Sequence, residues 1–342
     1  MRHLPLNRIT AEMFLAHSIF GNDGRVLLNK GTKLTPSYLQ RLAKMGYTHL
    51  YVYEAADEKW NCTGPLSDRI RAEAMCVLWQ SLIRVVERKP LNEQQISFVV
   101  EGILKEVLQR EDYVFDLIDL KTADNYIYNH SLNVCVLSIL MGKVFKFNRD
   151  ELKELALGAF LHDLGKAYIK SAVKKIQALS LMDTVQIKQH TKRGFDILRA
   201  VTGFPARVAN IAYQHHERED GSGYPLGLIG VDIPIYSKIV GIADSFDAMV
   251  SQRVYKNPLW NDEALQELEK ESPAKYHPTV VAALRRSVAL YPVGSVVQLT
   301  GGEERVVVAV SATKIILQKT DKLNDLLELP VSALSRIEKR IA

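Results

Sequence analysis

Residues His215–Pro225 read HHEREDGSGYP, and this stretch is the starting point for the fold and the chemistry. Two adjacent imidazoles stand at the start of a polar loop that contains two glycines and ends in Gly-Tyr-Pro. Adjacent side chains on a helix point about 100° apart, so the two rings point in different directions. The glycines allow the loop backbone to fold close to the helix.

Further histidines and aspartates stand at informative places in the same part of the chain. They are His130 in YIYNHS, His162 and Asp163 in GAFLHDLGK, His190 in IKQHTKRG, and Asp244 in GIADSFDA. Asp163 follows an apolar helical run, where a carboxylate has to be paired or to bind a metal ion. Imidazole is the commonest nitrogen ligand of first-row transition metals. Lys166 lies on the same helical face as Asp163 if the helix continues, and it suits a charge clamp on a metal-bound phosphate. The remaining histidines read as surface or packing residues: His3, His17, His49 and His277.

The spacing of apolar residues predicts a mainly α protein with small β-containing ends. From 111 to 290 the apolar residues follow the helical period, and Val134–Phe145 reads as a buried core helix too short to span a bilayer. Turn signals and a helix–Gly–strand pattern predict a small α/β module in residues 1–54. Residues 55–110 read as a linker and helical spacer. Residues 291–342 read as a β-rich appendage with a turn at Gly301-Gly302.

The composition is that of an ordinary globular protein, with 342 residues, 47% hydrophobic and 24% charged, and a net charge of +5. This length allows two or more domains. No apolar run follows Met1–Pro5, so no signal peptide is expected. Three widely spaced cysteines without a CxxC pair favour a reducing, cytoplasmic compartment. Without a basic stripe interleaved with aromatic residues, neither a nucleic-acid polymer nor a membrane is expected as a partner.

The order H…HD…H…HH…D, with HHEREDGSGYP and IADSFDAMVSQRVYK, resembles the HD-GYP subfamily of the HD metal-dependent phosphohydrolases. The resemblance covers residues 112–290 and implies a helical HD-domain bundle that holds divalent metal ions, usually iron or manganese. Residues 1–54 also resemble the small module found ahead of some HD-GYP domains. The metal ligands that the resemblance implies are His130, His162, Asp163, His190, His215, His216 and Asp244.

The resemblance also implies roles for residues around these ligands. Asp163 would bridge two metal ions, and Lys166 would contact the scissile phosphate or support the leaving group. Asp247 in SFDAM either orients a metal ligand or is a helix-surface or capping residue. The substrate contacts that the resemblance implies are Gly223, Tyr224, Pro225, Arg253 and Lys256.

The activity implied is that of a cyclic di-GMP phosphodiesterase, an enzyme of bacterial second-messenger signalling. A metal-bridged hydroxide would attack phosphorus in line with the ribose 3′ oxygen, while Lys166 and Arg253 neutralise charge on the phosphoryl oxygens. The product would be pGpG, with further cleavage to GMP left open. Two alternatives are an HD phosphohydrolase acting on another cyclic nucleotide or dinucleotide, and a catalytically weak or inactive cyclic di-GMP receptor. A homodimer through residues 67–109 and regulatory protein partners are further expectations.

Three positions depart from the family pattern. Tyr126 stands where some members place a Glu that helps to hold a third metal ion, so we expect two ions and pGpG as the main product. The segment KSAVKKIQALSLMD at 170–183 lacks the Lys-Pro-Gly that is common there, which bears on substrate affinity or rate. Lys238 stands where an Arg often precedes the IAD motif, so a point charge replaces a bidentate phosphate contact.

Overall fold

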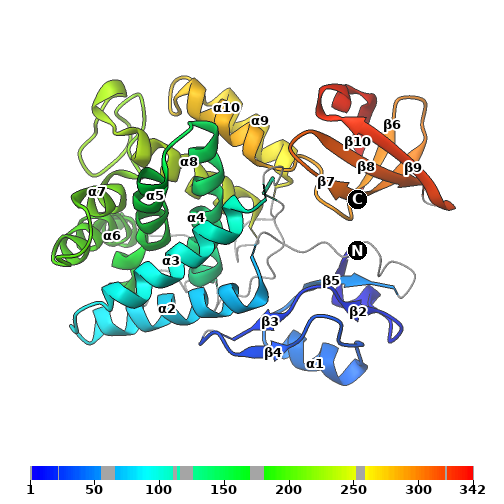
Figure 1. Cartoon of the computed structure of the whole chain (residues 1–342), viewed down its shortest axis with the longest axis horizontal. Coiled ribbons are helices and arrows are strands. Elements are labelled where there is room, and N and C mark those ends of the chain that lie inside the picture. Colours follow the sequence, from blue (N-terminus) through cyan, green and yellow to red (C-terminus); the bar gives the residue numbers. More distant parts are fainter. Residues whose placement is uncertain are drawn as a thin grey trace.

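The computed structural model describes residues 2–21, 23–54, 66–110, 114–115, 126–169, 181–251, 259–319 and 322–341. Three separate hydrophobic cores divide them into an N-terminal unit, a helical unit and a C-terminal unit (Figure 1). The prediction of a mainly α fold with two small β-containing ends is therefore confirmed. Within the described ranges, no helix is both long enough and apolar enough to cross a membrane.

The N-terminal unit combines two small antiparallel sheets with one helix. One sheet has the order β1-β5-β2, from β1 (Arg2–Pro5), β5 (His49–Tyr53) and β2 (Phe14–Leu15), and β3 (Ile19–Phe20) pairs with β4 (Val26–Leu28). Helix α1 (Pro36–Lys44) begins at Thr35, whose hydroxyl accepts a hydrogen bond from the Tyr38 amide. The chain then turns at Gly46, where φ is 89°, before it enters β5. The predicted helix–Gly–strand pattern is present.

The helical unit packs its helices around one large core. Its elements are α2 (Asp68–Val86), α3 (Glu93–Leu108), α4 (Tyr126–Val144), α5 (Arg149–Leu161), α6 (Leu181–Arg199), α7 (Ala206–Gln214), α8 (Ile235–Val250), α9 (Asn261–Lys270) and α10 (Pro278–Ser287). Helix α4 packs on α5 and α8, and α7 packs on α5 and α6. Helices α2 and α3 bury apolar residues in the same core, so the region predicted as a helical spacer lies against the bundle.

Local sequence determines where helices α4 and α5 lie and end. Val134, Leu137 and Met141 on α4 are fully buried, as predicted for a core helix. Helix α5 begins with a capping box, in which Asn148 and Glu151 each bind the backbone amide of the other. It ends at Leu161, so His162 and Asp163 stand between its last turn and the short helix η3 (Leu164–Tyr168).

The C-terminal unit is a five-stranded antiparallel sheet in the order β10-β6-β7-β8-β9. Its elements are β6 (Val296–Leu299), β7 (Glu304–Val310), β8 (Lys314–Lys319), β9 (Lys322–Pro330), the short helix η5 (Val331–Arg336) and β10 (Ile337–Arg340). Gly301 and Gly302 form the turn between β6 and β7 with φ of 104° and 88°, where the sequence predicts a turn. Both angles lie in the left-handed region that favours glycine.

Candidate metal centre

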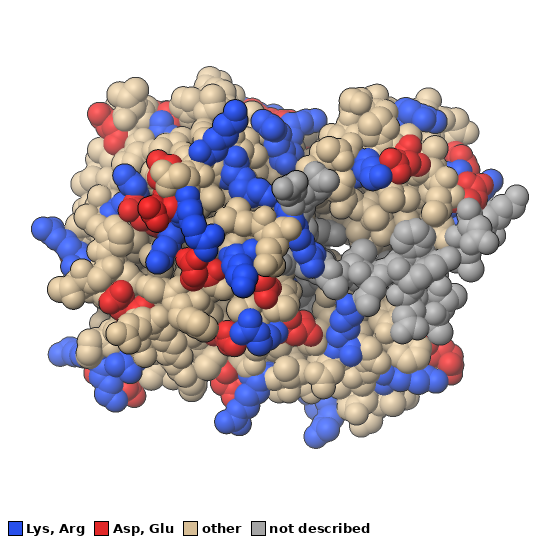
Figure 2. All heavy atoms as spheres, in the orientation of Figure 1, with Lys and Arg blue, Asp and Glu red and all other residues tan. Residues whose placement is uncertain are grey.

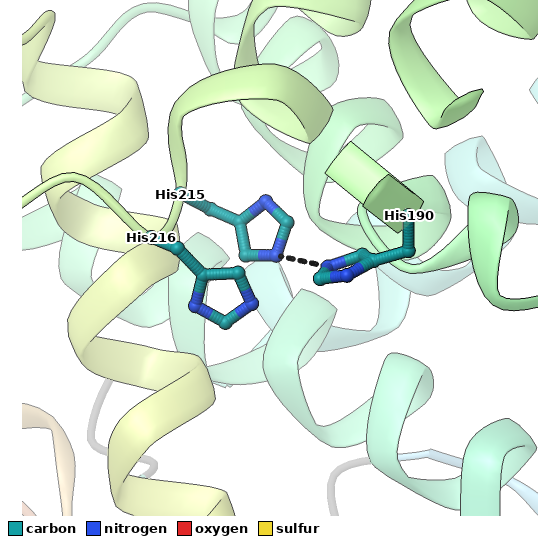
Figure 3. Close-up of side chains that lie close together, drawn as sticks. All are labelled: His190, His215 and His216. Carbon is teal, nitrogen blue, oxygen red and sulfur yellow. Dashed lines mark hydrogen bonds between the residues drawn. The ribbon is translucent and has the colours of Figure 1, made fainter. Parts of the chain in front are cut away.

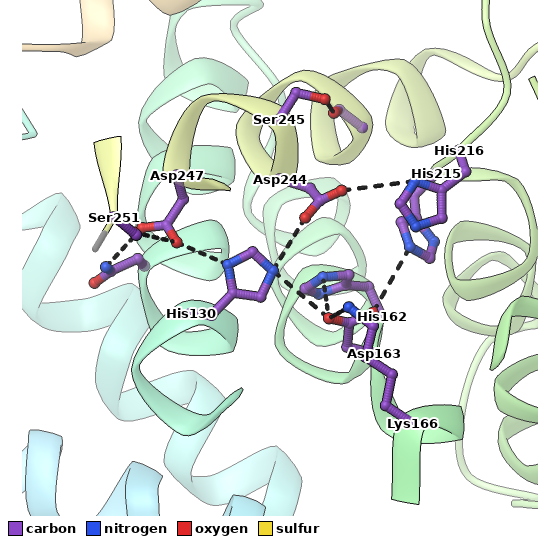
Figure 4. Close-up of polar contacts among 12 residues, drawn as sticks. His130, His162, Asp163, Lys166, His215, His216, Asp244, Ser245, Asp247 and Ser251 are labelled. Atoms are coloured by element: carbon purple, nitrogen blue, oxygen red, sulfur yellow. Dashed lines mark hydrogen bonds and ion pairs between the residues drawn. The ribbon is translucent and has the colours of Figure 1, made fainter. Parts of the chain in front are cut away.

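Side chains from five consecutive parts of the bundle converge at one buried point. Figure 4 shows those from α4, from α8 and from the turns after α5 and α7. The structure brings together all seven residues that the sequence analysis names as metal ligands. They are His130 on α4, His162 and Asp163 after α5, His190 on α6, His215 and His216 after α7, and Asp244 on α8. His216 is partly exposed, and the other six side chains are buried or nearly so.

Asp163 lies at the middle of this cluster, with its two oxygens facing different imidazoles. Its Oδ2 atom is 3.4 Å from Nε2 of His162 and 3.6 Å from Nε2 of His130. Its Oδ1 atom is 3.4 Å from Nε2 of His190 and 3.9 Å from Nε2 of His215. One carboxylate therefore faces two sets of nitrogen donors, which is the arrangement that a bridging ligand requires.

The donors fall into overlapping groups whose ligand atoms lie within 4.8 Å of one another. Asp244 completes one group with His130 and His162, and its Oδ1 atom is 3.0 Å from Nε2 of His130. The two adjacent histidines, His215 and His216, complete a second group with His190 (Figure 3). The adjacent pair therefore contributes both rings to the same side of the cluster.

Backbone carbonyls fix the ring orientation of three histidines. The Nδ1 atoms of His162, His190 and His215 lie 2.8, 2.6 and 3.0 Å from the carbonyl oxygens of Ala159, Ile187 and Ala212. Because a carbonyl oxygen only accepts, each Nδ1 carries a proton, and in the neutral ring Nε2 then keeps its lone pair. All three Nε2 atoms face the cluster.

Two observations test whether these residues fit metal ions. The Nε2 atoms of His190 and His215 face each other at 3.4 Å, so two lone pairs repel unless a cation lies between or beside them (Figure 3). Nε2 of His162 and Oδ1 of Asp163 are buried, and neither makes a hydrogen bond to any described residue. Buried polar atoms without partners are rare in native proteins. Nitrogen and carboxylate donors of this kind suit first-row transition metals, so the residues fit the group.

Electrostatics holds most of the donors in the protonation states that metal binding needs. Burial lowers the pKa of His190 to about 4 and holds the pKa values of His215 and His216 well below the usual range. Burial alone would raise the pKa of Asp163, but the charge of Lys166 and the surrounding imidazoles hold it well below the usual value. These three imidazoles are therefore neutral and the carboxylate is ionised near neutral pH, as in ligand sets.

His130 is held differently from the other histidines. Its Nδ1 atom donates to Oδ2 of Asp247 at 2.7 Å, and Asp247 also accepts hydrogen bonds from Asn133 (2.8 Å) and Ser251 (3.1 Å). Burial would lower the pKa of His130, but Asp244 and Asp247 outweigh it and raise this pKa. Of the two interpretations of Asp247, the structure therefore favours the partner of a ligand. The sequence analysis did not identify Asn133, whose only signal is an amide one turn after His130 in an apolar run.

A glycine brings the His-Asp turn close to α6. A Cβ atom on Gly165 would lie 2.0 Å from the carbonyl oxygen of His190, so only glycine fits there. Next to it, Lys166 forms an ion pair with Asp163 through Oδ2. The side chain of Lys166 is 21% exposed, so this ion pair lies at the edge of the buried cluster.

The Gly-Tyr-Pro loop covers His216. The ring of Tyr224 stacks on the ring of His216, with centroids 4.7 Å apart and an interplanar angle of 27°. The ammonium group of Lys188 lies 4.9 Å from the centre of the Tyr224 ring. A Cβ atom on Gly223 would lie 2.5 Å from the carbonyl oxygen of His216, so this glycine permits the close approach of the loop. Tyr224 is therefore beside the metal centre, and Pro225 follows it in the loop.

The acid of HHE, Glu217, holds this loop in place and was not identified from the sequence. Its side chain is buried, and its two oxygens accept hydrogen bonds from the amides of Leu226 (2.7 Å) and Leu228 (2.9 Å). Lys238, expected as a point charge towards phosphate, is paired with Glu219 at 2.8 Å. Glu217 therefore supports the shape of the loop, and Glu219 supplies a counter-charge to Lys238.

Some predicted residues lie outside the described ranges. Among them are Arg253, Lys256, most of the 170–183 segment and the side chain of Tyr126. Of the remaining histidines, His17 packs edge-on against Tyr51 in the N-terminal unit, and His277 caps the start of α10 by accepting from the Thr279 amide.

Several known proteins are similar to this chain in sequence. Residues 114–280 match the model of a family described as the HD domain. A cyclic di-GMP phosphodiesterase of Pseudomonas aeruginosa is 32% identical over 219 residues, which cover 64% of this chain and 52% of the relative. A cyclic di-GMP phosphodiesterase of Thermotoga maritima is 38% identical over 194 residues, or 54% of this chain and 53% of the relative. A 3′3′-cGAMP-specific phosphodiesterase of Vibrio cholerae is 29% identical over 214 residues, or 56% of this chain and 41% of the relative. The chain thus spans about half the length of the first two relatives.

Proposed function

Residues 114–280 form an HD domain, and on that premise we propose that the chain is a metal-dependent phosphodiesterase that hydrolyses cyclic di-GMP to pGpG. The single observation that carries the proposal is the placement of Asp163 between two sets of imidazole nitrogens. Two curated cyclic di-GMP phosphodiesterases among the relatives support the choice of substrate. The match covers about half of each of these two relatives, so both the substrate and the product are proposed for this chain.

The proposed ligand set would hold two divalent ions, iron or manganese, with Asp163 as the shared ligand. His130, His162 and Asp244 would hold one ion, and the imidazoles of His190, His215 and His216 would hold the other. When bound, the metal ions supply an activated water and positive charge next to the scissile phosphate. The buried, ionised carboxylates and neutral imidazoles are what this proposal requires of the chain.

The chain's own residues have separate proposed tasks. Lys166, paired with Asp163 at the edge of the cluster, would contact the phosphate that undergoes cleavage or support the leaving 3′ oxygen. Tyr224 and the loop after Glu217 would form one wall of the substrate site. Arg253 and Lys256 would contact the phosphates of the ligand, and only the sequence resemblance supports this role.

A second substrate is favoured by one specific observation. The relative from Vibrio cholerae is named for 3′3′-cGAMP, a cyclic dinucleotide that does not carry the same two bases as cyclic di-GMP. The proposal is therefore tested with both dinucleotides in parallel. We also propose a cytoplasmic location, supported by the widely spaced cysteines. A homodimer through residues 67–109 and regulatory partners stay predictions.

The test is hydrolysis of cyclic di-GMP by the full chain purified without oxygen and loaded with Mn or Fe, with products resolved by chromatography. Metal content is measured on the same samples. His162→Ala and Asp163→Ala should abolish turnover, whereas His277→Ala, outside the metal centre, should retain it. Faster hydrolysis of 3′3′-cGAMP would replace the substrate proposed here, and bound cyclic di-GMP without turnover under any metal would indicate a receptor. Abundant GMP would contradict pGpG as the main product.

A further inference from the structure

A cavity lies between the helical unit and the C-terminal unit, apart from the metal centre. Its volume is about 650 Å³, within the usual range of small-molecule sites. Its walls come from the end of α4, the end of α10 and the residues after it, the turn between β7 and β8, and η5. Leu140 in this wall is ten residues after His130, so about 15 Å of helix α4 separates the cavity from the metal centre.

The cavity is lined by positive charge. No acidic side chain is found among its described lining residues, which include four cations: Lys143, Arg285, Arg286 and Lys314. Arg286 is exposed, and its guanidinium makes no ion pair or hydrogen bond to any residue that the structure describes. The Lys143 ammonium donates to the carbonyl oxygen of Arg110 at 3.2 Å, which leaves its charge without a counter-ion in the described parts of the chain. Figure 2 shows Lys and Arg side chains gathered over α9 and α10 next to the C-terminal unit.

The other two cations have acidic partners that lie outside the cavity. Arg285 pairs with Glu269 at 2.7 Å, and Lys314 pairs with Glu328 at 3.1 Å. Neither Glu269 nor Glu328 is among the lining residues. The wall that faces the cavity therefore keeps a cationic character, and this favours an anionic ligand.

The rest of the lining is apolar or carries hydroxyl groups. Leu140, Val144 and Leu290 are among the apolar residues, and Ser311, Thr313, Ser332 and Ser335 add hydroxyl groups. A ligand that satisfies this lining has an anionic group, a flat apolar part and hydrogen-bonding edges. A guanidinium binds phosphate oxygens in a bidentate way. We propose that this cavity binds a nucleoside phosphate, with the phosphate at Arg286 and Lys143 and the base against the apolar wall.

The binding test uses a fluorescent nucleotide, trinitrophenyl-labelled GTP, with the full chain in EDTA, so that metal-dependent binding at the metal centre does not contribute. Arg286→Glu should weaken binding by about tenfold or more, because a charge-assisted contact becomes a repulsive one. The matched control is Lys105→Glu on the exposed face of α3, which changes the net charge by the same amount and should leave affinity unchanged. Equal weakening in both variants would reduce the effect to overall charge and overturn the proposal.

A second variant and a competition complete the test. Ser332→Trp places a large side chain at the exposed edge of the cavity and should also weaken probe binding, while thermal unfolding shows that the variant is folded. Unlabelled GTP should displace the probe at concentrations at which inorganic phosphate does not. Displacement by phosphate as effective as that by GTP would show an anion site without base recognition, and unchanged binding in Ser332→Trp would place the probe elsewhere. Either result overturns the proposal, and neither depends on phosphodiesterase activity.

Discussion

His130 and Asp247 are joined by a 2.7 Å hydrogen bond between Nδ1 and Oδ2, and neither side chain is more than 1% exposed. The carboxylate accepts this hydrogen bond and thereby turns Nε2 of His130 towards Asp163 and Asp244. Outer partners of this kind orient a ligand ring and raise its basicity. Asp247 therefore belongs to the candidate metal centre although it faces no metal-binding position itself.

Asp247→Asn should weaken metal binding by about 10–100-fold while the chain stays folded, because a neutral amide accepts the His130 proton less strongly. The measurement is competition for metal with a chelator of known affinity. Ser251→Ala is the control, since it removes one 3.1 Å donor to Asp247 and keeps the carboxylate. Equal metal affinity in Asp247→Asn and the unchanged chain would contradict this role.

Gly165→Ala should destabilise the helical unit by about 1–3 kcal/mol, because the new methyl group would overlap the His190 carbonyl oxygen, 2.0 Å away. Gly194→Ala is the matched control on the facing helix. Its Cβ atom would meet atoms no closer than 3.5 Å, and a helical alanine gains up to about 1 kcal/mol over glycine. Urea unfolding of both variants gives the comparison, and similar stabilities would count against the close approach.

Glu217→Gln should loosen the Gly-Tyr-Pro loop, because an amide side chain has one oxygen for the two amides that the carboxylate serves. Hydrogen exchange at Leu226 or Leu228 should accelerate by about tenfold or more. Glu219→Gln, in the same loop but paired with Lys238, should leave exchange at both amides unchanged. Unchanged exchange in Glu217→Gln would mean that other contacts hold the loop.

Tyr224→Ala should lower kcat/KM by about two- to thirteenfold, because the ring stacked on His216 is worth about 0.5–1.5 kcal/mol. Tyr224→Phe keeps the ring and should stay near the unchanged chain. Burial raises the pKa of the Tyr224 hydroxyl, so this group is neutral and supplies no base near neutral pH. A loss in Tyr224→Phe as large as that in Tyr224→Ala would assign the role to the hydroxyl.

His17 should make the chain less stable as the pH falls. Burial, followed by the charges of Arg71 and Lys30, lowers the pKa of His17 to about 3, against about 6.5 in the unfolded chain. The free energy of unfolding is therefore unaffected by protonation of His17 above pH 6.5. It decreases as the pH falls from 6.5 towards 3, since over this range only the unfolded chain takes up the proton. The loss between pH 7 and pH 5 is about 2 kcal/mol at most. His17→Leu should lose less unfolding free energy over this interval, as measured by urea unfolding, and parallel losses in both proteins would exclude this contribution.

The candidate ligands were named from the order H…HD…H…HH…D, which resembles the HD-GYP pattern. Each stands on or beside an apolar helical run, where an isolated charge or imidazole needs a partner. The hydrogen-bond partners of these candidate ligands could not be predicted from the sequence. His130 and Asp247 are 117 residues apart, and an aspartate three residues after Asp244 looks the same in sequence whether it caps a helix or binds a ring. Glu217 gave no signal either, since the amides that it binds belong to a loop whose path depends on packing.

The fold was predictable where the signal is local and not where it depends on docking. The turn at Gly301-Gly302 and the strand after Gly46 follow from backbone preferences of glycine. The packing of α2 and α3 onto the bundle, and the cavity between two units, depend on surfaces brought together in space. Helical spacing alone does not distinguish a spacer from a helix that completes a core.

The metal-centre residues are spread from α4 to α8, and this spread determines at which stage of folding the site can form. A ligand set distributed over five elements closes only after the whole bundle has assembled, since loop closure precedes long-range contacts. The apolar core that supports these elements is large and contains no ligand side chain. Folding should therefore come first and metal binding second, so that in the proposed metal-dependent reaction the supply of ions, rather than folding, would limit how much of the folded protein is active.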